Sequence, residues 1–321
     1  MHPSQICILG GTGFLGSHLA CRLIRDGHRV RVLTRDRYQH RDLWVLPGLE
    51  LVNLDVFDAG RLAEALRGCD VAVNLIGILN ERGRDGSGFM RAHAQLAATV
   101  VGACRSAGVP RLLQMSALRA AEDAPSHYLR SKALAERAIR ERAGPVAWTI
   151  FRPSVIFGPG DSFLNRFATL LALSPVLPLA RGAARFQPVF VGDVVEAMVR
   201  SLARADSIGA SYELGGPEIL SLVALVRYVG ELTGRRRLVF GLPDALGRLQ
   251  ALLLGYFPGK PLSLDNFNSM GLDSVCRDDG LGRLGITPTA LRGIAPTYLG
   301  SSSRGGPGGG GAGAPGQPPG T

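Results

Sequence analysis

The chain has 321 residues, of which 46% are hydrophobic, 19% are charged and 6% are aromatic, and its formal net charge is +10. It contains no apolar run of about 18 residues, so we expect no transmembrane helix. The charge can reflect arginines scattered over the surface, or an anionic partner such as a nucleic acid, a phospholipid surface or a phosphorylated ligand. Few aromatic residues and no zinc-finger spacing argue against the first of these partners, and we predict that no nucleic acid is bound.

The cysteines and histidines indicate neither a disulfide framework nor a metal centre. The five cysteines are scattered without a CxxC motif, which favours buried thiols in a reducing compartment. The six histidines have no ligand-like spacing, so we predict no metal site. A strand-like segment is reached by residue 6, which leaves no room for a signal peptide. We therefore expect a cytoplasmic chain, or one from which a targeting segment has been removed.

Strand and helix patterns alternate over the first 117 residues. Apolar runs predict strands at 5–10, 29–35, 49–55, 71–77 and 111–117. Apolar residues at helical spacing, ending at glycine, predict helices at 16–27, 59–68 and 92–108. Because the strands are apolar on both faces, they are typical of a parallel sheet covered on both sides. The fold class predicted is α/β, a Rossmann doubly wound parallel sheet.

The pattern changes after residue 155. A helix at 126–143 and a strand at 147–154 still continue the alternation. Helices at 162–173, 192–204 and 220–234 are then joined by loops and short strands. We predict a nucleotide-binding domain at 1–155 and a smaller C-terminal lobe at 156–298 that is interleaved with it. Residues 299–321 form a Gly/Pro-rich tail with almost nothing to bury, and we expect it to be disordered.

The segment GGTGFLG (10–16) has the glycine spacing of a dinucleotide-binding loop, and it directly follows a strand and opens a helix. Gly10 would permit a tight turn, Gly13 a close approach of the pyrophosphate, and Gly16 close packing of the helix on the strand. Free N–H groups at the helix N-terminus favour an anionic phosphate. The predicted cofactor-binding residues of this loop are Gly10, Thr12, Gly13, Phe14, Leu15 and Gly16.

The end of the second strand indicates which dinucleotide is bound. In this fold an acid there favours a free ribose 2′-hydroxyl, and an arginine favours a 2′-phosphate. The strand ends LTRDR (33–37), with Arg35 at its end and Asp36 directly after. We therefore favour NADP(H) over NAD(H), while Asp36 leaves NAD(H) open.

Only two lysines occur in the chain, Lys132 and Lys260, and the first stands four residues after Tyr128 in YLRSKALAE (128–136). Residues at this spacing lie on one face of a helix. A nearby ammonium favours the phenolate, and we expect it to lower the pKa of Tyr128 so that the phenol serves as a general acid or base. The lysine can also hold the ribose of a nicotinamide, as a compact donor that arginine does not replace.

Taken together, these motifs resemble the short-chain dehydrogenase/reductase superfamily in its extended or atypical branch. The resemblance covers residues 5–298 and also rests on NLDVFD (53–58), NLIG (74–77), QMSAL (114–118) and RPSVIFGPGD (152–161). It implies a catalytic set in which Ser116 orients a substrate oxygen, Tyr128 transfers the proton, and Lys132 binds the ribose. It further implies cofactor contacts from Asp55 and Val56 at the adenine, from Asn74, Leu75, Ile76 and Gly77 along the cofactor, and from Arg152 and Pro153 near the nicotinamide.

A narrower resemblance rests on NLIGIL (74–79), YLRSKALAE (128–136), RPSVIFGPGDSFLNRFA (152–168) and FQPVFVGDVVEAM (186–198). In these segments the sequence is similar to the NADPH-binding accessory subunit of respiratory complex I and its bacterial relatives. In the mitochondrial subunit the cofactor is held tightly for a structural role, whereas the bacterial relatives are epimerase-, dehydratase- or reductase-like. Extended enzymes often carry a second hydroxyl residue beside the serine, but position 117 is Ala117. The resemblance adds a respiratory complex or a membrane surface to the candidate partners, and a peripheral position on the inner face of a respiratory membrane to the candidate locations.

Three hypotheses follow. The first is an oxidoreductase or epimerase/dehydratase that uses NADP(H) and a small-molecule substrate of unknown identity. The second is a non-catalytic, NADPH-stabilised accessory or assembly protein of respiratory complex I. The third, a redox-sensing regulator, depends on fold analogy alone.

The stretch 241–259 can form an amphipathic helix, with Leu246, Leu249, Leu252, Leu253 and Phe257 on one side. Three consecutive arginines, 235–237, precede it. Such a helix can face the protein core, or it can lie on a membrane or a partner. The sequence leaves both alternatives open.

Overall fold

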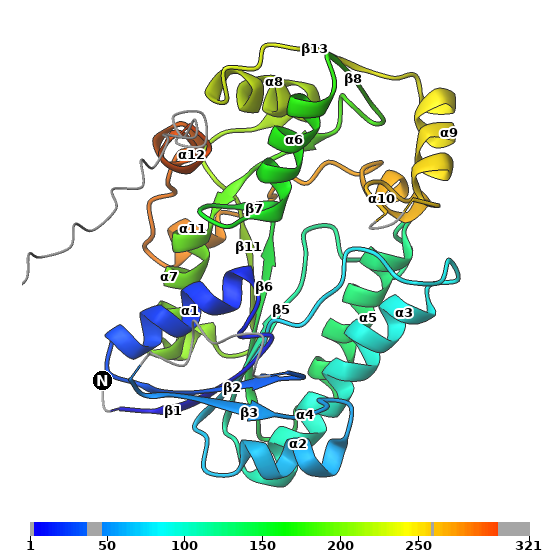
Figure 1. Cartoon of the computed structure of the whole chain (residues 1–321). Coiled ribbons are helices and arrows are strands. Elements are labelled where there is room, and N and C mark those ends of the chain that lie inside the picture. Colours follow the sequence, from blue (N-terminus) through cyan, green and yellow to red (C-terminus); the bar gives the residue numbers. More distant parts are fainter. Residues whose placement is uncertain (1–2, 37–46, 258–259, 301–321) are drawn as a thin grey trace, which may run out of the picture.

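The computed structural model describes residues 3–36, 47–257 and 260–300. Its centre is a parallel sheet of seven strands in the order β11-β6-β5-β4-β1-β2-β3 (Figure 1). The first strand lies between β2 and β4, where the winding of the sheet reverses, and ligands of open α/β sheets bind at the carboxyl ends of the strands at such a point. The strands are β1 (Gln5–Leu9), β2 (Arg29–Thr34), β3 (Leu49–Asn53), β4 (Val71–Asn74), β5 (Arg111–Met115), β6 (Ala147–Pro153) and β11 (Ala210–Leu214).

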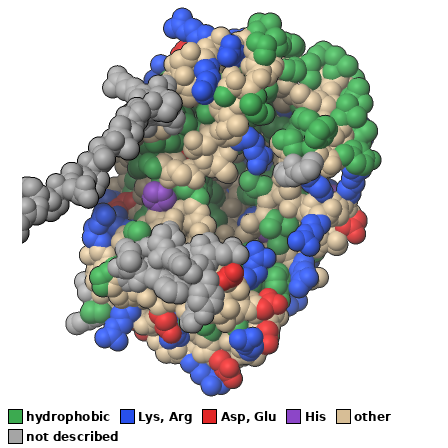
Figure 2. Space-filling view, in the orientation of Figure 1, with side chains coloured by type: hydrophobic (Ala, Val, Ile, Leu, Met, Phe, Trp, Pro, Cys, Tyr) green, Lys and Arg blue, Asp and Glu red, His purple; other side chains and the backbone are tan. Residues whose placement is uncertain are grey.

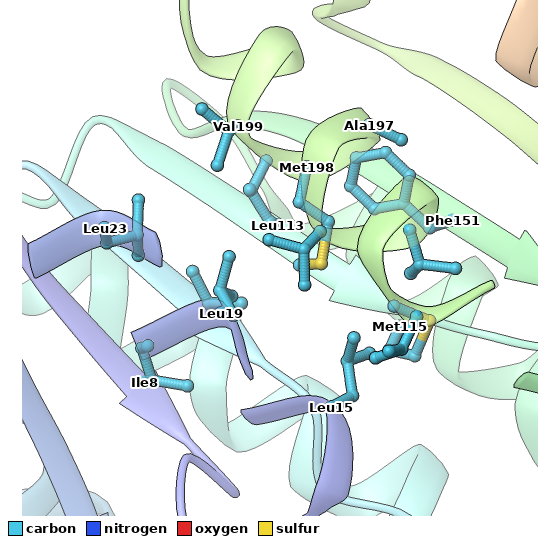
Figure 3. Close-up of a cluster of buried hydrophobic side chains, with 14 of the residues drawn as sticks. Ile8, Leu15, Leu19, Leu23, Leu113, Met115, Phe151, Ala197, Met198 and Val199 are labelled. Atoms are coloured by element: carbon cyan, nitrogen blue, oxygen red, sulfur yellow. The ribbon is translucent and has the colours of Figure 1, made fainter. Parts of the chain in front are cut away.

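Two layers of helices bury the two faces of this sheet. One face packs against α1 (Phe14–Arg25), α7 (Val191–Leu202) and α11 (Gly280–Arg283). The other packs against α2 (Ala59–Leu66), α4 (Leu96–Ala107) and α5 (His127–Arg142). Figure 3 shows the first of these cores, in which side chains of α1, β1, β5, β6 and α7 meet. Its labelled members are Ile8, Leu15, Leu19, Leu23, Leu113, Met115, Phe151, Ala197, Met198 and Val199.

The second lobe has a separate core above the carboxyl edge of the sheet (Figure 1). Its helices are α6 (Ser162–Leu173), α8 (Leu222–Leu232), α9 (Asp244–Leu254), α10 (Leu264–Ser269) and α12 (Leu291–Leu299). Its short strands pair as β7 (Ile156–Phe157) with β10 (Val189–Phe190), β8 (Val176–Leu179) with β13 (Leu238–Gly241), and β9 (Arg185–Phe186) with β12 (Leu220–Ser221). The remaining elements are α3 (Ser87–Phe89), the π-helix η2 (Met90–Gln95) and the 3-10 helix η3 (Ala205–Ser207).

The structure confirms the α/β doubly wound sheet and all six strands predicted up to residue 154. It adds β11, which the sequence patterns did not predict, and it places α7 on the sheet. Both elements lie beyond residue 155, so the chain returns to the first domain after entering the second lobe. The division at that residue stays a prediction.

The predicted tail, residues 299–321, begins inside a helix, so the prediction of disorder is wrong at Leu299. Leu299 is the last residue of α12 and is buried, so order continues to that position. The predicted disorder of the tail from residue 301 onwards lies outside the described residues. Within the described part of the chain, no helix has the length and apolar character needed to cross a membrane.

Candidate active site

The glycines of the loop between β1 and α1 are required by its geometry. Gly10 has φ +80°, a left-handed conformation, and its carbonyl accepts a hydrogen bond from the Gly13 N–H at 3.1 Å. A Cβ on Gly16 would lie 2.3 Å from the Gly10 carbonyl oxygen, so only glycine lets α1 pack this closely. The first turn of α1 contains no acidic residue, and its N-cap, Gly13, carries no side chain that could block an anion. The loop therefore fits the pyrophosphate of a dinucleotide.

Thr12, Phe14 and Leu15 belong to the same turn, where they are half-buried, half-buried and buried. Arg35 follows the last residue of β2 and is exposed, while Asp36 beside it is half-buried. The two residues thus stand at the carboxyl edge predicted to face the adenosine ribose.

The residues that follow β3 and β4 lie at the same edge of the sheet. The Asp55 carboxylate accepts a hydrogen bond from the Phe57 N–H at 3.1 Å, and Val56 is buried. Asn74 is buried and bridges two strand ends, because its side-chain amide donates to Gln114 Oε1 at 2.9 Å and its oxygen accepts from the Ile76 N–H at 3.2 Å. The side chain of Asn74 therefore shapes the Asn74–Gly77 turn, whose Leu75 and Ile76 are half-buried and whose Gly77 is exposed.

Tyr128 and Lys132 share one face of α5, on which Lys132 is buried and Tyr128 is half-buried. Helix α5 begins at Ser126, whose hydroxyl accepts from the Leu129 N–H at 3.2 Å and so places Tyr128 in the first turn. The Lys132 ammonium donates to the Met115 carbonyl at 3.3 Å and lies 5.9 Å from the Tyr128 ring centroid. A Cβ on Gly77 would lie 3.2 Å from Lys132 Nζ, so glycine keeps this face open.

The titration of this pair differs from the sequence expectation. Burial, and secondarily the Asp265 carboxylate, raise the pKa of Tyr128 to about 12, where the sequence led us to expect a lowered pKa. Burial lowers the pKa of Lys132 to about 8, although Glu136 opposes that change. The expectation of a lowered pKa was wrong because the loss of solvent around the phenol and the nearby Asp265 carboxylate both raise its pKa. Tyr128 is therefore a protonated phenol at neutral pH.

A buried histidine, which the sequence analysis did not single out, connects this pair to the turn after β4. His93 lies in the π-helix η2, and its ring lies edge-on to Tyr128 with the centroids 5.5 Å apart. Its Nε2 accepts from the Ile78 N–H at 3.0 Å, so its Nδ1 carries the proton and donates to Ser131 Oγ at 2.7 Å. The Ser131 hydroxyl in turn donates to the Tyr128 carbonyl at 2.7 Å. Burial, with Lys132 nearby, lowers the pKa of His93 to about 2, which keeps the ring neutral.

The hydroxyl of Ser116 is held by a buried carboxylate. Ser116 Oγ donates to Glu136 Oε1 at 2.6 Å, and Glu136 stands four residues after Lys132 on the same face of α5. Arg152 Nε donates to Glu136 Oε1 at 2.7 Å, its Nη2 also contacts this carboxylate, and Arg140 Nη2 donates to Glu136 Oε2 at 2.8 Å. Ser116 and Arg152 therefore meet at Glu136, while Pro153 is buried at the end of β6. The predicted contacts of Ser116 with substrate and of Arg152 and Pro153 with cofactor stay predictions.

Two residues from the second-lobe part of the chain, Asp265 and Lys260, form hydrogen bonds with the segments that carry the site. The sequence patterns did not predict this role for either of them. The Asp265 carboxylate of α10 accepts from the His127 N–H at 2.6 Å and from the Tyr128 N–H at 3.1 Å. The ammonium of Lys260 donates to the carbonyls of Glu81, Arg82 and Gly83 at 2.6, 3.1 and 3.1 Å. The ammonium of Lys260 has three N–H donors and can therefore bond to three carbonyls that converge on it. Both lysines of the chain thus form hydrogen bonds with backbone carbonyls around this site.

The histidines, cysteines and acids form no metal centre within the described residues, where no group of three or more could hold an ion. All five cysteines are free thiols; Cys7, Cys69 and Cys104 are buried and Cys21 and Cys276 are half-buried.

The lowered pKa of Lys132 predicts how stability depends on pH. Its ordinary pKa is 10.5, so between pH 8 and that value the unfolded chain holds a proton that the folded chain has released. The free energy of unfolding should therefore rise with pH across this window. Urea unfolding at several pH values measures this effect. The free energy of unfolding of the wild type minus that of Lys132→Met should rise by about 2 kcal/mol from about pH 8 to about pH 10. A constant difference would contradict the lowered pKa, and other titrating groups cancel because both proteins share them.

Comparison with known proteins shows which family the chain belongs to. A model of the NAD dependent epimerase/dehydratase family matches residues 6–215. The chain is 32% identical over 294 residues to the mitochondrial NADH dehydrogenase [ubiquinone] 1 alpha subcomplex subunit 9 of Mus musculus, covering 88% of this chain and 76% of that protein. It is 36% identical over 197 residues to a ceramide reductase of Caulobacter vibrioides, covering 60% of this chain and 59% of that protein.

The fold has close counterparts among solved structures. A dTDP-glucose 4,6-dehydratase from Streptomyces venezuelae with bound NAD superposes with a TM-score of 0.71 at 23% identity, over 92% of this chain and 95% of that one. The family match covers both the phosphate loop and the Tyr128–Lys132 pair. Because the family is NAD dependent, the cofactor class is a nicotinamide dinucleotide. The chain belongs to the NAD dependent epimerase/dehydratase family.

Proposed function

We propose that the chain is an NADP(H)-dependent oxidoreductase or epimerase/dehydratase in which Tyr128 moves the proton. The observation that carries this proposal is the face of α5 that holds the half-buried Tyr128 and the buried Lys132 and is kept open by Gly77. Family membership supports it, since the phosphate loop and this pair both fall within residues 6–215. Because the relative from Caulobacter vibrioides is named a ceramide reductase, lipid carbonyls belong among the substrates to be screened.

The protonation states favour reduction of a carbonyl. A bound nicotinamide supplies hydride chemistry next to this face. Tyr128 keeps its proton at neutral pH, as a tyrosine with the ordinary pKa of 10 also does, and a phenol that holds its proton can donate it to a developing alkoxide. Lys132, on the same face, would hold a ribose hydroxyl, and His93 would orient both α5 and the Asn74–Gly77 turn through its two hydrogen bonds.

The preference for NADP(H) is proposed from Arg35. Its exposed guanidinium at the end of β2 would pair with a ribose 2′-phosphate. Replacing Arg35 by serine should weaken NADPH binding about 10-fold or more and leave NADH binding within about 2-fold, because one charge-assisted contact is lost only with the phosphorylated ribose. Fluorescence titration with each nucleotide measures this, and Arg29→Ser, at the opposite end of β2, is the matched control. An equal loss for both nucleotides would contradict the assignment.

A second candidate is a non-catalytic accessory protein of respiratory complex I. The arrangement of Ser116 favours it, because its hydroxyl proton is directed at the Glu136 carboxylate and not at a substrate position. The relative from Mus musculus is named as a subunit of NADH dehydrogenase, which makes a respiratory complex the partner to look for and a peripheral place on its membrane the matching location.

Release and exchange of bound nucleotide separate the two candidates. The nucleotide released from the purified protein by acid or heat should be identified, and its exchange with added NADPH and NADH followed. An empty or rapidly exchanging site supports the enzyme. Tightly held NADP(H) that scarcely exchanges supports the accessory protein and would direct the search to a respiratory complex. Release of NAD(H) would overturn the assignment of Arg35.

A further inference from the structure

Helix α9 packs on the protein with its small side chains and turns its large apolar ones outwards. Gly247 and Ala251 are buried, and a Cβ on Gly247 would lie 3.2 Å from both Ala180 and Phe267, so this face is in close contact with the lobe. The outward side chains Leu246, Leu249 and Leu253 are 53%, 50% and 56% exposed, and Tyr256 and Phe257, just after the end of the helix, are 69% and 60% exposed. Of the two alternatives that the sequence left open, the core-facing helix is therefore excluded, because the apolar stripe is exposed.

More apolar side chains are exposed on α6, β8 and β13. Leu173 at the end of α6 is 78% exposed, and the paired residues Val176 of β8 and Leu238 of β13 are 41% and 61% exposed. Figure 2 shows hydrophobic side chains gathered over α9 and the adjoining β8–β13 edge, at the upper right of the molecule. Monomeric soluble proteins rarely expose so many large apolar groups together, so the surface is suited to bind an apolar partner.

The charged groups around this surface are cationic. The guanidinium of Arg84 lies 3.8 Å over the Tyr256 ring, and Arg248 is exposed on α9 itself. The three arginines 235–237 are exposed directly before β13. The single acid of α9, Asp244, is paired with Arg181 at 2.6 Å. Apolar side chains framed by arginines and an exposed tyrosine are typical of helices that lie in the interface of an anionic bilayer.

We propose that α9 and the adjoining β8–β13 edge form a docking surface for an anionic phospholipid membrane. The positive frame favours anionic lipid over a second copy of the chain, since a two-fold dimer would bring the same arginines together. The surface lies beside the candidate site. Lys260 and Asn266, which follow α9, hold the turn after β4 by donating to the carbonyls of Glu81 at 2.6 Å and Leu79 at 3.0 Å. A docked chain would therefore have its site next to the lipid surface.

Co-sedimentation of the full chain with phosphatidylcholine vesicles, with and without phosphatidylglycerol, tests the proposal. The wild type should bind the anionic vesicles, and binding should weaken as salt is raised. The double variant Leu249→Glu/Leu253→Glu should bind at least about 10-fold less, because both side chains leave the bilayer and two negative charges are added. The single variant Leu249→Glu should also bind less, and Ile208→Glu is its matched control because each adds one negative charge. Ile208 is 53% exposed but lies on the loop before β11, so this control should bind like the wild type.

Each other outcome overturns the proposal. Failure of the wild type to bind anionic vesicles would do so, and equal loss in the Ile208→Glu control would show that the effect is only of net charge. If the wild type instead forms a dimer in sedimentation velocity that the double variant abolishes, without vesicle binding, the surface is an interface between copies. Unchanged thermal melting of the variants confirms that they are folded, which is expected because both leucines are already half exposed.

Discussion

Replacing Glu136 by glutamine should lower the free energy of unfolding by about 2–3 kcal/mol. The side chain of Glu136 is 1% exposed and accepts from Ser116, Arg152 and Arg140 at once. Removing its charge leaves the guanidinium of Arg152 without its carboxylate, and breaking a buried ion pair typically costs about 3–5 kcal/mol. The expected value is smaller because the side chains of Arg152 and Arg140 are 25% and 40% exposed, so water solvates part of the released charge.

Urea unfolding of the two proteins at neutral pH measures this difference. The matched control is Glu122→Gln, whose partner Arg137 lies at 2.7 Å but in an ion pair where both side chains are about half exposed. The control should change the free energy of unfolding by less than about 1 kcal/mol. If the two substitutions cost the same, the cluster at Glu136 contributes no more than a surface pair.

The sequence predicted the sheet well because its signals are local. Alternating apolar runs and helical patterns place β1 to β6 without reference to tertiary contacts. The strand β11 was missed because only two of its five residues are buried, and it joins the sheet only after a long passage through the second lobe. The sequence left the orientation of α9 open, since a helical stripe of leucines does not specify whether it faces the core or the outside.

The candidate site was predicted in part for the same reason. Tyr128 and Lys132 are four residues apart, so their common face follows from helix geometry. Glu136 continues that spacing and could have been found by extending it one turn. His93 and Asp265 could not, because they reach Tyr128 from a π-helix and from the second lobe, 35 and 137 residues away in the chain. Burial by these neighbours is also what raises the pKa of Tyr128, which no local pattern reveals.

Replacing Tyr128 by phenylalanine should reduce turnover by about 10²- to 10⁴-fold while cofactor affinity changes by less than about 3-fold. Only the hydroxyl is lost, and with it the group that would deliver the proton. The ring contacts with Phe89 at 6.0 Å and His93 at 5.5 Å remain, so the fold around α5 should be retained. NADPH oxidation with long-chain ketones measures reduction, formation of a keto sugar from dTDP-glucose in the presence of NADP⁺ measures the redox-neutral dehydratase reaction, and fluorescence titration measures binding.

The matched control is Tyr228→Phe, because Tyr228 lies in the core of the second lobe beneath Arg292 and away from α5. It should keep full turnover. Retained turnover in Tyr128→Phe would overturn the role of the phenol. If the wild type turns over none of these probes and holds its nucleotide without exchange, the accessory function is the better account. In that case Tyr128→Phe should leave assembly with a respiratory complex unchanged, whereas disruption of the loop at Gly16 should abolish both nucleotide binding and assembly.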